Sequence, residues 1–154
     1  MRKRWRIVAC AVGVASLSAA VGYTAPPLTG KDAFIQRQDT MKRMGRAFYL
    51  GIGRVLKGTA EFGPDTVAAA EAVASLSSTL GSLFPPGSDV AESRMKPEIF
   101  NAQKDVERLI MEVQGATGRL VPAVKSADKG AIAAAYKSVN DACESCHTEF
   151  RKSE

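Results

Sequence analysis

Apolar side chains recur at steps of three or four residues along four stretches of the chain, and none of them shows the strict alternation of a half-buried strand. The pattern predicts helices at about residues 32–57, 65–84, 97–122 and 128–150. Their apolar seams are Phe34, Met41, Phe48, Ile52 and Val55; then Val73, Leu76, Leu80 and Leu83; then Ile99, Val106, Leu109, Ile110, Val113 and Leu120; and finally Ile132, Tyr136, Val139, Cys143, Cys146 and Phe150. The chain is therefore expected to be all-α.

Residues that favour the start or the end of a helix support these boundaries. Pro64-Asp65 is a start signal, Pro85-Pro86-Gly87 is a stop signal, Pro97 suits a first helical position, and Asp128 can cap the last helix. Helices of about 18 to 26 residues are roughly 27 to 39 Å long, and short connections favour antiparallel neighbours. We predict an antiparallel four-helix bundle over residues 31–154.

The N-terminus has the organisation of an export signal. Arg2, Lys3, Arg4 and Arg6 precede an apolar run from Ile7 to about Ala19, and small residues follow. An uncleaved membrane anchor is the alternative, but the run is shorter than the roughly 18 apolar residues that span a bilayer. The expected organisation is a signal peptide at 1–22, cleaved after Ala20 or Gly22, and a flexible leader at 23–30. The mature protein would then be periplasmic, without stable membrane insertion.

Charge and cysteine content change once this segment is removed. The full chain carries a net charge of +5, but residues 23–154 hold 17 Lys and Arg against 16 Asp and Glu, a net charge near +1. Nucleic-acid binding has little support, because a basic face is its usual footprint. Cys10 also leaves, so two cysteines remain.

Those two cysteines form the sequence Cys143-Glu144-Ser145-Cys146-His147 near the C-terminus. This spacing is typical of covalent haem c attachment: each thiol bonds one vinyl group of a porphyrin, and the adjoining imidazole binds the iron. A redox dithiol would be expected beside a βαβ pattern, and a structural zinc site needs four ligands. We expect one covalent haem c held by Cys143 and Cys146, with His147 as the proximal iron ligand.

The ligand on the opposite face of the iron is less determined. His147 is the only histidine, so a thioether, an amine, water or nothing must occupy that position. The methionines beyond residue 22 are Met41, Met44, Met95 and Met111. A peroxidase would need an acid/base group over the iron, and the only histidine is already used, so we do not expect an enzyme.

The whole mature chain resembles the class II cytochromes c, which comprise the cytochrome c-prime family and its low-spin c-556 relatives. The resemblance is carried by Arg37-Gln38, by Met41-Lys42-x-x-Gly45-Arg46, by Lys96-Pro97-Glu98-Ile99-Phe100, and by the segment from Cys143 to Lys152. Class I cytochromes c place the haem motif near the start instead. Phe100 departs from the family, since many members have Trp at this position.

The resemblance implies roles for three further residues. Met41 resembles the distal iron ligand of the low-spin members. Arg37 resembles a family position near the haem propionates, and Arg151, one turn beyond His147, would contact the propionates or the surroundings of the proximal ligand. For either arginine, an ordinary solvated surface charge is the competing interpretation.

The implied function is a periplasmic one-electron carrier with a low-spin iron bound by His147 and Met41. It would serve redox partner proteins of a respiratory or photosynthetic chain, as a monomer or a homodimer. The alternative is a five-coordinate, high-spin cytochrome c-prime that binds nitric oxide or carbon monoxide.

Overall fold

A computed structural model describes residues 28–153. The expected signal peptide and residues 23–27 of the expected leader lie outside the described residues. Within the described part, the only extended pairing is an isolated bridge between Met95 and Arg151. The helical elements are α1 (Gly30–Gly45), η1 (Arg46–Gly53), α2 (Arg54–Leu56), α3 (Pro64–Ser77), η2 (Leu80–Ser82), η3 (Pro97–Phe100), α4 (Gln103–Lys125) and α5 (Lys129–Phe150).

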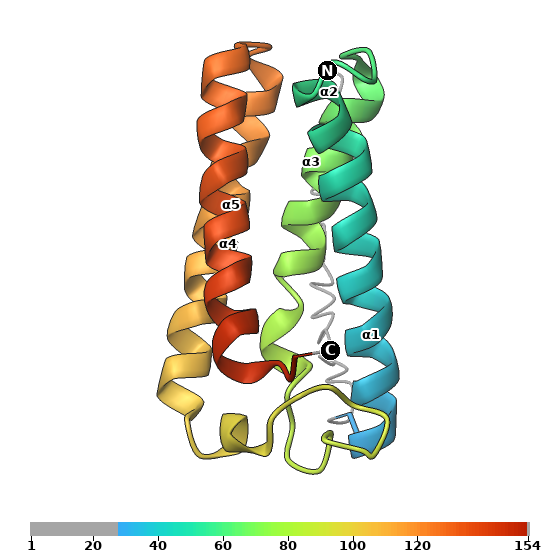
Figure 1. Cartoon of the computed structure of the whole chain (residues 1–154), viewed down its shortest axis with the longest axis vertical. Coiled ribbons are helices and arrows are strands. Elements are labelled where there is room, and N and C mark those ends of the chain that lie inside the picture. Colours follow the sequence, from blue (N-terminus) through green and yellow to red (C-terminus); the bar gives the residue numbers. More distant parts are fainter. Residues whose placement is uncertain (1–27, 154) are drawn as a thin grey trace, which may run out of the picture.

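The long helices form the predicted antiparallel four-helix bundle (Figure 1). The elements α1, η1 and α2 make one continuous helix, which packs against α3, and α3 packs against α4, which in turn packs against α5. Short turns at one end join α2 to α3 and α4 to α5, and a long segment wraps the other end, where the chain also finishes (Figure 1). None of the helices in the described part is long and apolar enough to span a membrane.

The buried face of the first helix differs from the predicted seam. Its buried residues follow steps of three and four: Ala33, Arg37, Thr40, Met44, Phe48 and Ile52. Phe34, Met41 and Val55 are only partly buried. Arg37 was not counted as a core residue because a charged side chain is buried only where it finds partners, and here the partners come from a distant loop.

The second helix is shorter than predicted. It ends at Ser77. Leu80 lies in the short 3-10 helix η2 and Leu83 directly follows that helix, and both side chains are buried in the core. The hydroxyls of Ser77, Ser78 and Thr79 each bond a backbone carbonyl three residues earlier. Such hydroxyls compete with the helical ladder, which explains the early end.

The last helix agrees closely with the sequence pattern, and the third agrees with it from Gln103 onward. Asp128 caps α5, as predicted, and its Oδ1 accepts a hydrogen bond from the Ala131 N–H at 2.7 Å. In contrast, Pro97 opens only a separate 3-10 turn, and α4 begins at Gln103. The last two helices hold 23 and 22 residues and are therefore about 33 to 35 Å long.

Two glycines allow the first helix to approach its neighbours closely. A Cβ atom built on Gly51 would lie 2.5 Å from the Cβ atom of Ala69 on α3. One built on Gly53 would lie 2.7 Å from the Tyr136 hydroxyl on α5. Helix packing therefore accounts for both glycines.

Replacing Gly51 by alanine is expected to destabilise the bundle by about 1 to 3 kcal/mol, because the new methyl group forces η1 and α3 apart. Gly118→Ala on the exposed face of α4 is the control, because no atom of residues 28–153 lies within 4 Å of its Cβ position. This control should stabilise the protein by about 0.5 to 1 kcal/mol through helix propensity. Thermal unfolding of the two holoproteins measures both effects, and equal melting temperatures would contradict the close packing at Gly51.

Candidate functional site

A cavity of about 620 Å³ lies inside the bundle. It is bounded by two apolar clusters, one built mainly on the four long helices and a smaller one formed by Met95, Ile99, Val106, Leu109 and Phe150. Cys143 packs against the first cluster and Cys146 against the second. The thiols therefore lie where the two clusters meet.

The predicted attachment residues share one wall of this cavity. Cys143, Cys146 and His147 all come from the last two turns of α5, and all three line the cavity while being only partly exposed. Three positions along a helix bring both thiols to one face, and the adjacent imidazole reaches the same cavity. The structure thus brings together all three residues of the predicted motif.

The thiol environment is unlike that of a redox dithiol. Burial, the Cys146 thiol and the Glu144 carboxylate raise the pKa of Cys143 to about 11. Burial and Glu149 raise the pKa of Cys146 as well. Reactive dithiols have lowered pKa values, often at helix N-termini, whereas these two thiols lie at the C-terminal end of α5. The dithiol alternative therefore finds no support here.

The imidazole of His147 is suited to ligate a metal ion. Burial lowers its pKa and the charge of Arg151 lowers it further, while Glu144 acts in the opposite direction. A neutral imidazole has a free ring nitrogen that can bind iron. His147 is therefore held in the form that a proximal ligand requires.

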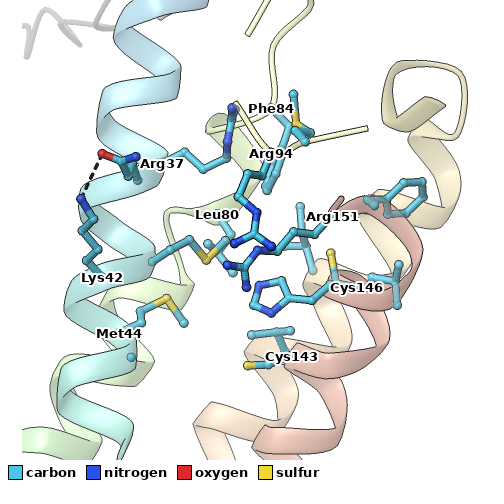
Figure 2. A pocket seen from close by; sticks show the side chains of 18 of the residues that line it. Arg37, Lys42, Met44, Leu80, Phe84, Arg94, Cys143, Cys146 and Arg151 are labelled. Atoms are coloured by element: carbon cyan, nitrogen blue, oxygen red, sulfur yellow. Dashed lines mark hydrogen bonds between the residues drawn. The ribbon is translucent and has the colours of Figure 1, made fainter. Parts of the chain in front are cut away.

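The first helix supplies the facing wall. Met41, Met44, Gly45 and Phe48 all line the cavity. Figure 2 shows Met44 on α1 across the cavity from Cys143 and Cys146 on α5. Met44 is 6% exposed and belongs to the apolar cluster, whereas Met41 is partly buried against it. Both thioethers thus line the site, and the buried one is Met44, although the predicted apolar seam contained Met41.

Two further cavity residues, Arg94 and Met95, were not expected from the sequence. Both lie in the irregular segment before η3, yet both line the cavity, and Met95 is 7% exposed. Helical periodicity cannot detect them, since they lie outside any helix. Met111, by contrast, is 63% exposed on α4 and is therefore not a candidate for the distal iron ligand.

The two candidate arginines are placed differently. Arg37 lines the cavity and is 7% exposed, so it is not a solvated surface charge. Arg151 also lines the cavity, directly after the end of α5, and it is exposed. Arg94 and Arg151 both extend toward the middle of the cavity (Figure 2).

These residues fit a covalently bound haem. The cavity volume lies within the usual range of cofactor sites, and its lining is largely apolar apart from arginines and a few polar groups. Two thiols and a neutral imidazole occupy one wall. A flat, apolar macrocycle with two carboxylates would match this combination of apolar lining and cationic side chains.

Comparison with known proteins places the chain in a family. The sequence model of the family described as Cytochrome C' matches residues 32–151. A cytochrome c' of Allochromatium vinosum is 33% identical over 89 residues, which cover 54% of this chain and 58% of that protein. A cytochrome c' of Rhodospirillum rubrum is 27% identical over 139 residues, covering 90% and 95%. A cytochrome c-555 of Bradyrhizobium diazoefficiens is 27% identical over 128 residues, covering 79% and 83%.

Solved structures show the same fold. A cytochrome c' described as having a ligand-controlled dimer dissociation superimposes with a TM-score of 0.74 at 29% identity, covering 82% of this chain and 98% of that one. A nitric oxide complex of a variant cytochrome c' from Alcaligenes xylosoxidans superimposes with a TM-score of 0.73 at 25% identity, covering 81% and 98%.

These relatives correct the functional prediction and confirm the class. The low-spin electron carrier with His and Met ligands is not supported, and the cytochrome c' alternative is the better supported interpretation. The cofactor is one covalently attached haem c. With its four-helix bundle and its C-terminal haem motif, the chain belongs to the cytochrome c' family of class II cytochromes c.

Proposed function

We propose that this protein is a periplasmic, five-coordinate cytochrome c' that binds nitric oxide or carbon monoxide on the iron face opposite His147. The observation that carries the proposal is the cavity wall facing the imidazole. It is built largely from apolar side chains of the first helix, and the described part of the chain has no second imidazole to place there. Small uncharged gases enter such an apolar site more readily than charged ligands do.

Each residue of the site then has a defined task. Cys143 and Cys146 hold the cofactor on α5 by thioether bonds, and His147 donates its neutral ring nitrogen to the iron. The bound haem supplies an iron centre that accepts a diatomic ligand. Phe48 and Met44 keep water and ions away from the opposite face, because both are buried in the apolar cluster. Binding without turnover needs no acid/base group, so we do not propose an enzyme.

A second candidate is the low-spin electron carrier, and one observation favours keeping it. Met41 and Met44 both line the cavity, and a thioether that reaches the iron would close the sixth position and raise the potential. A methionine on an apolar helical face is more often a gap-filling residue, so this candidate ranks second.

Met41→Ala and Met44→Ala distinguish these candidates. If the iron is five-coordinate, the parent and both variants have high-spin reduced spectra that shift with carbon monoxide, and the enlarged cavities change only the rate or affinity. If Met41 is a ligand, the parent is unaffected by the gas and Met41→Ala alone becomes high-spin. Met111→Ala is the control, because Met111 is 63% exposed. Optical titration of the holoproteins with carbon monoxide makes the measurement.

We also propose that the protein forms a homodimer through exposed apolar side chains of its first helix. Ile35 and Leu50 on the first helix are 54% and 57% exposed. A relative is described as a dimer whose dissociation is controlled by ligand. Sedimentation of the holoprotein with and without carbon monoxide tests whether a dimer forms and responds to gas.

A further inference from the structure

Most of the N–H groups of the Arg37 guanidinium donate hydrogen bonds to other groups of the protein. Its Nη1 donates to the Leu83 carbonyl at 2.7 Å and to Ser88 Oγ at 3.0 Å. Its Nη2 donates to the Ser88 carbonyl at 2.7 Å and to Ser93 Oγ at 3.3 Å. A guanidinium has five N–H groups, and four of them are used here. The two-pronged contact that holds a haem carboxylate would require Arg37 to give up these bonds.

The aromatic surroundings of Arg37 fix it further. The guanidinium carbon lies 5.4 Å from the centre of the Phe84 ring and 6.0 Å from that of Phe34. Phe84 extends from the same loop that accepts the hydrogen bonds, and Figure 2 shows Arg37 reaching from α1 toward it. Arg37 therefore anchors one end of the segment 83–96, which we call the strap.

The other end of the strap is bound to the end of α5. The Lys96 N–H donates to the Phe150 carbonyl at 2.8 Å, and the Lys152 N–H donates to the Arg94 carbonyl at 2.7 Å. The Lys96 ammonium donates to the carbonyls of Glu149 at 2.8 Å and Thr148 at 3.3 Å. The carbonyls of a last helical turn lack helical partners, so the strap supplies the donors that this turn needs.

One residue joins the two ends. Ser93 Oγ accepts from Arg37 and also from the Met95 N–H, at 3.1 Å. Hydrogen bonds thus run from α1, one turn before Met41, through the strap to the turn of α5 that follows His147. The strap links the two walls of the cavity.

We propose that Arg37 is a positioning residue that acts through the strap on the turn of α5 next to His147. The inference rests on the proposed attachment of haem to α5, but it holds whether the second iron face is open or closed. An α5 end without its donors would fray, and the imidazole would lose its fixed orientation toward the iron.

The test cuts the strap at each end in the holoprotein. Arg37→Gln removes the anchor on α1, and Lys96→Met removes the ammonium that caps α5. Arg43→Gln is the matched control, since Arg43 lies on the same helix, is 56% exposed and pairs with Asp39. Lys104→Met controls for the loss of an exposed lysine charge.

Amide hydrogen exchange of residues 93–97 and 147–153, measured by mass spectrometry, gives the first readout. We expect Arg37→Gln to accelerate exchange in both segments by about tenfold or more, although residue 37 lies in neither, while Arg43→Gln changes neither. The iron–histidine stretching band of the reduced haem gives the second readout. It should shift in Arg37→Gln and Lys96→Met, and the double variant should show no larger shift than the greater single one, because both cut the same path.

A haem carboxylate bound by Arg37 would give a different result. If Arg37 holds a haem carboxylate, Arg37→Gln leaves exchange at 147–153 unchanged, and its spectral effect adds to that of Lys96→Met. Should Arg37→Gln fail to fold, Ser93→Ala removes the joining hydroxyl alone, and unchanged exchange at 147–153 would then overturn the proposal. If a denaturing gel of the parent protein shows no covalent haem, the proposed attachment site is wrong. The exchange experiment would still test whether Arg37 acts on the end of α5 through the strap.

Discussion

Replacing Cys143 and Cys146 together by serine is expected to abolish covalently held haem. Serine hydroxyls cannot form the thioether bonds, and both thiols lie on the cavity wall beside His147. Haem staining of a denaturing gel should fall from full signal in the parent to background in the variant, a loss of about a hundredfold or more. His147 could still bind haem loosely in the native protein, so the denaturing step is essential.

Ser145→Ala provides the control within the same motif. Ser145 is exposed, and its hydroxyl donates to the Asp141 carbonyl on its own helix. This variant should keep full covalent haem. Haem that survives denaturation in the double cysteine variant would show that the attachment site has been assigned to the wrong residues.

The haem-free chain is expected to lose its native tertiary structure. An apolar cavity that its cofactor does not fill loses the packing contacts of its lining, and this cavity measures about 620 Å³. Domains of this size are stable by only about 5 to 15 kcal/mol. The cofactor therefore replaces core volume that the aliphatic side chains do not supply.

Circular dichroism of the double cysteine variant, purified without haem, checks this expectation. The near-ultraviolet signal should vanish and the melting transition should lose its cooperativity, while part of the far-ultraviolet helical signal remains. A cooperative transition within a few degrees of the holoprotein's would mean that the bundle folds without its cofactor and that the cavity collapses readily.

The sequence predicted the bundle well because long amphipathic helices carry their own signal. The seams of α4 and α5 and the Asp128 cap follow from periodicity and from a single side-chain hydrogen bond. The end of α3 escaped prediction because three hydroxyls bond back to the helix, a local competition that an apolar pattern does not register.

The proximal half of the site was also predictable, but the distal half was not. A five-residue motif on one helix fixes the arrangement of Cys143, Cys146 and His147. Arg37 instead meets partners 46 to 56 residues away, and their loop has no periodicity. Arg37 lies on the buried side of the first helix together with Met44, whereas the sequence pattern had placed Met41 on that side.

The most direct test of the proposed gas-binding site is the visible absorption spectrum of the reduced holoprotein before and after adding carbon monoxide. An open iron face predicts a high-spin spectrum that shifts when the gas is added. A low-spin spectrum that carbon monoxide leaves unchanged would contradict the proposal and would make the protein an electron carrier whose iron is closed by a thioether.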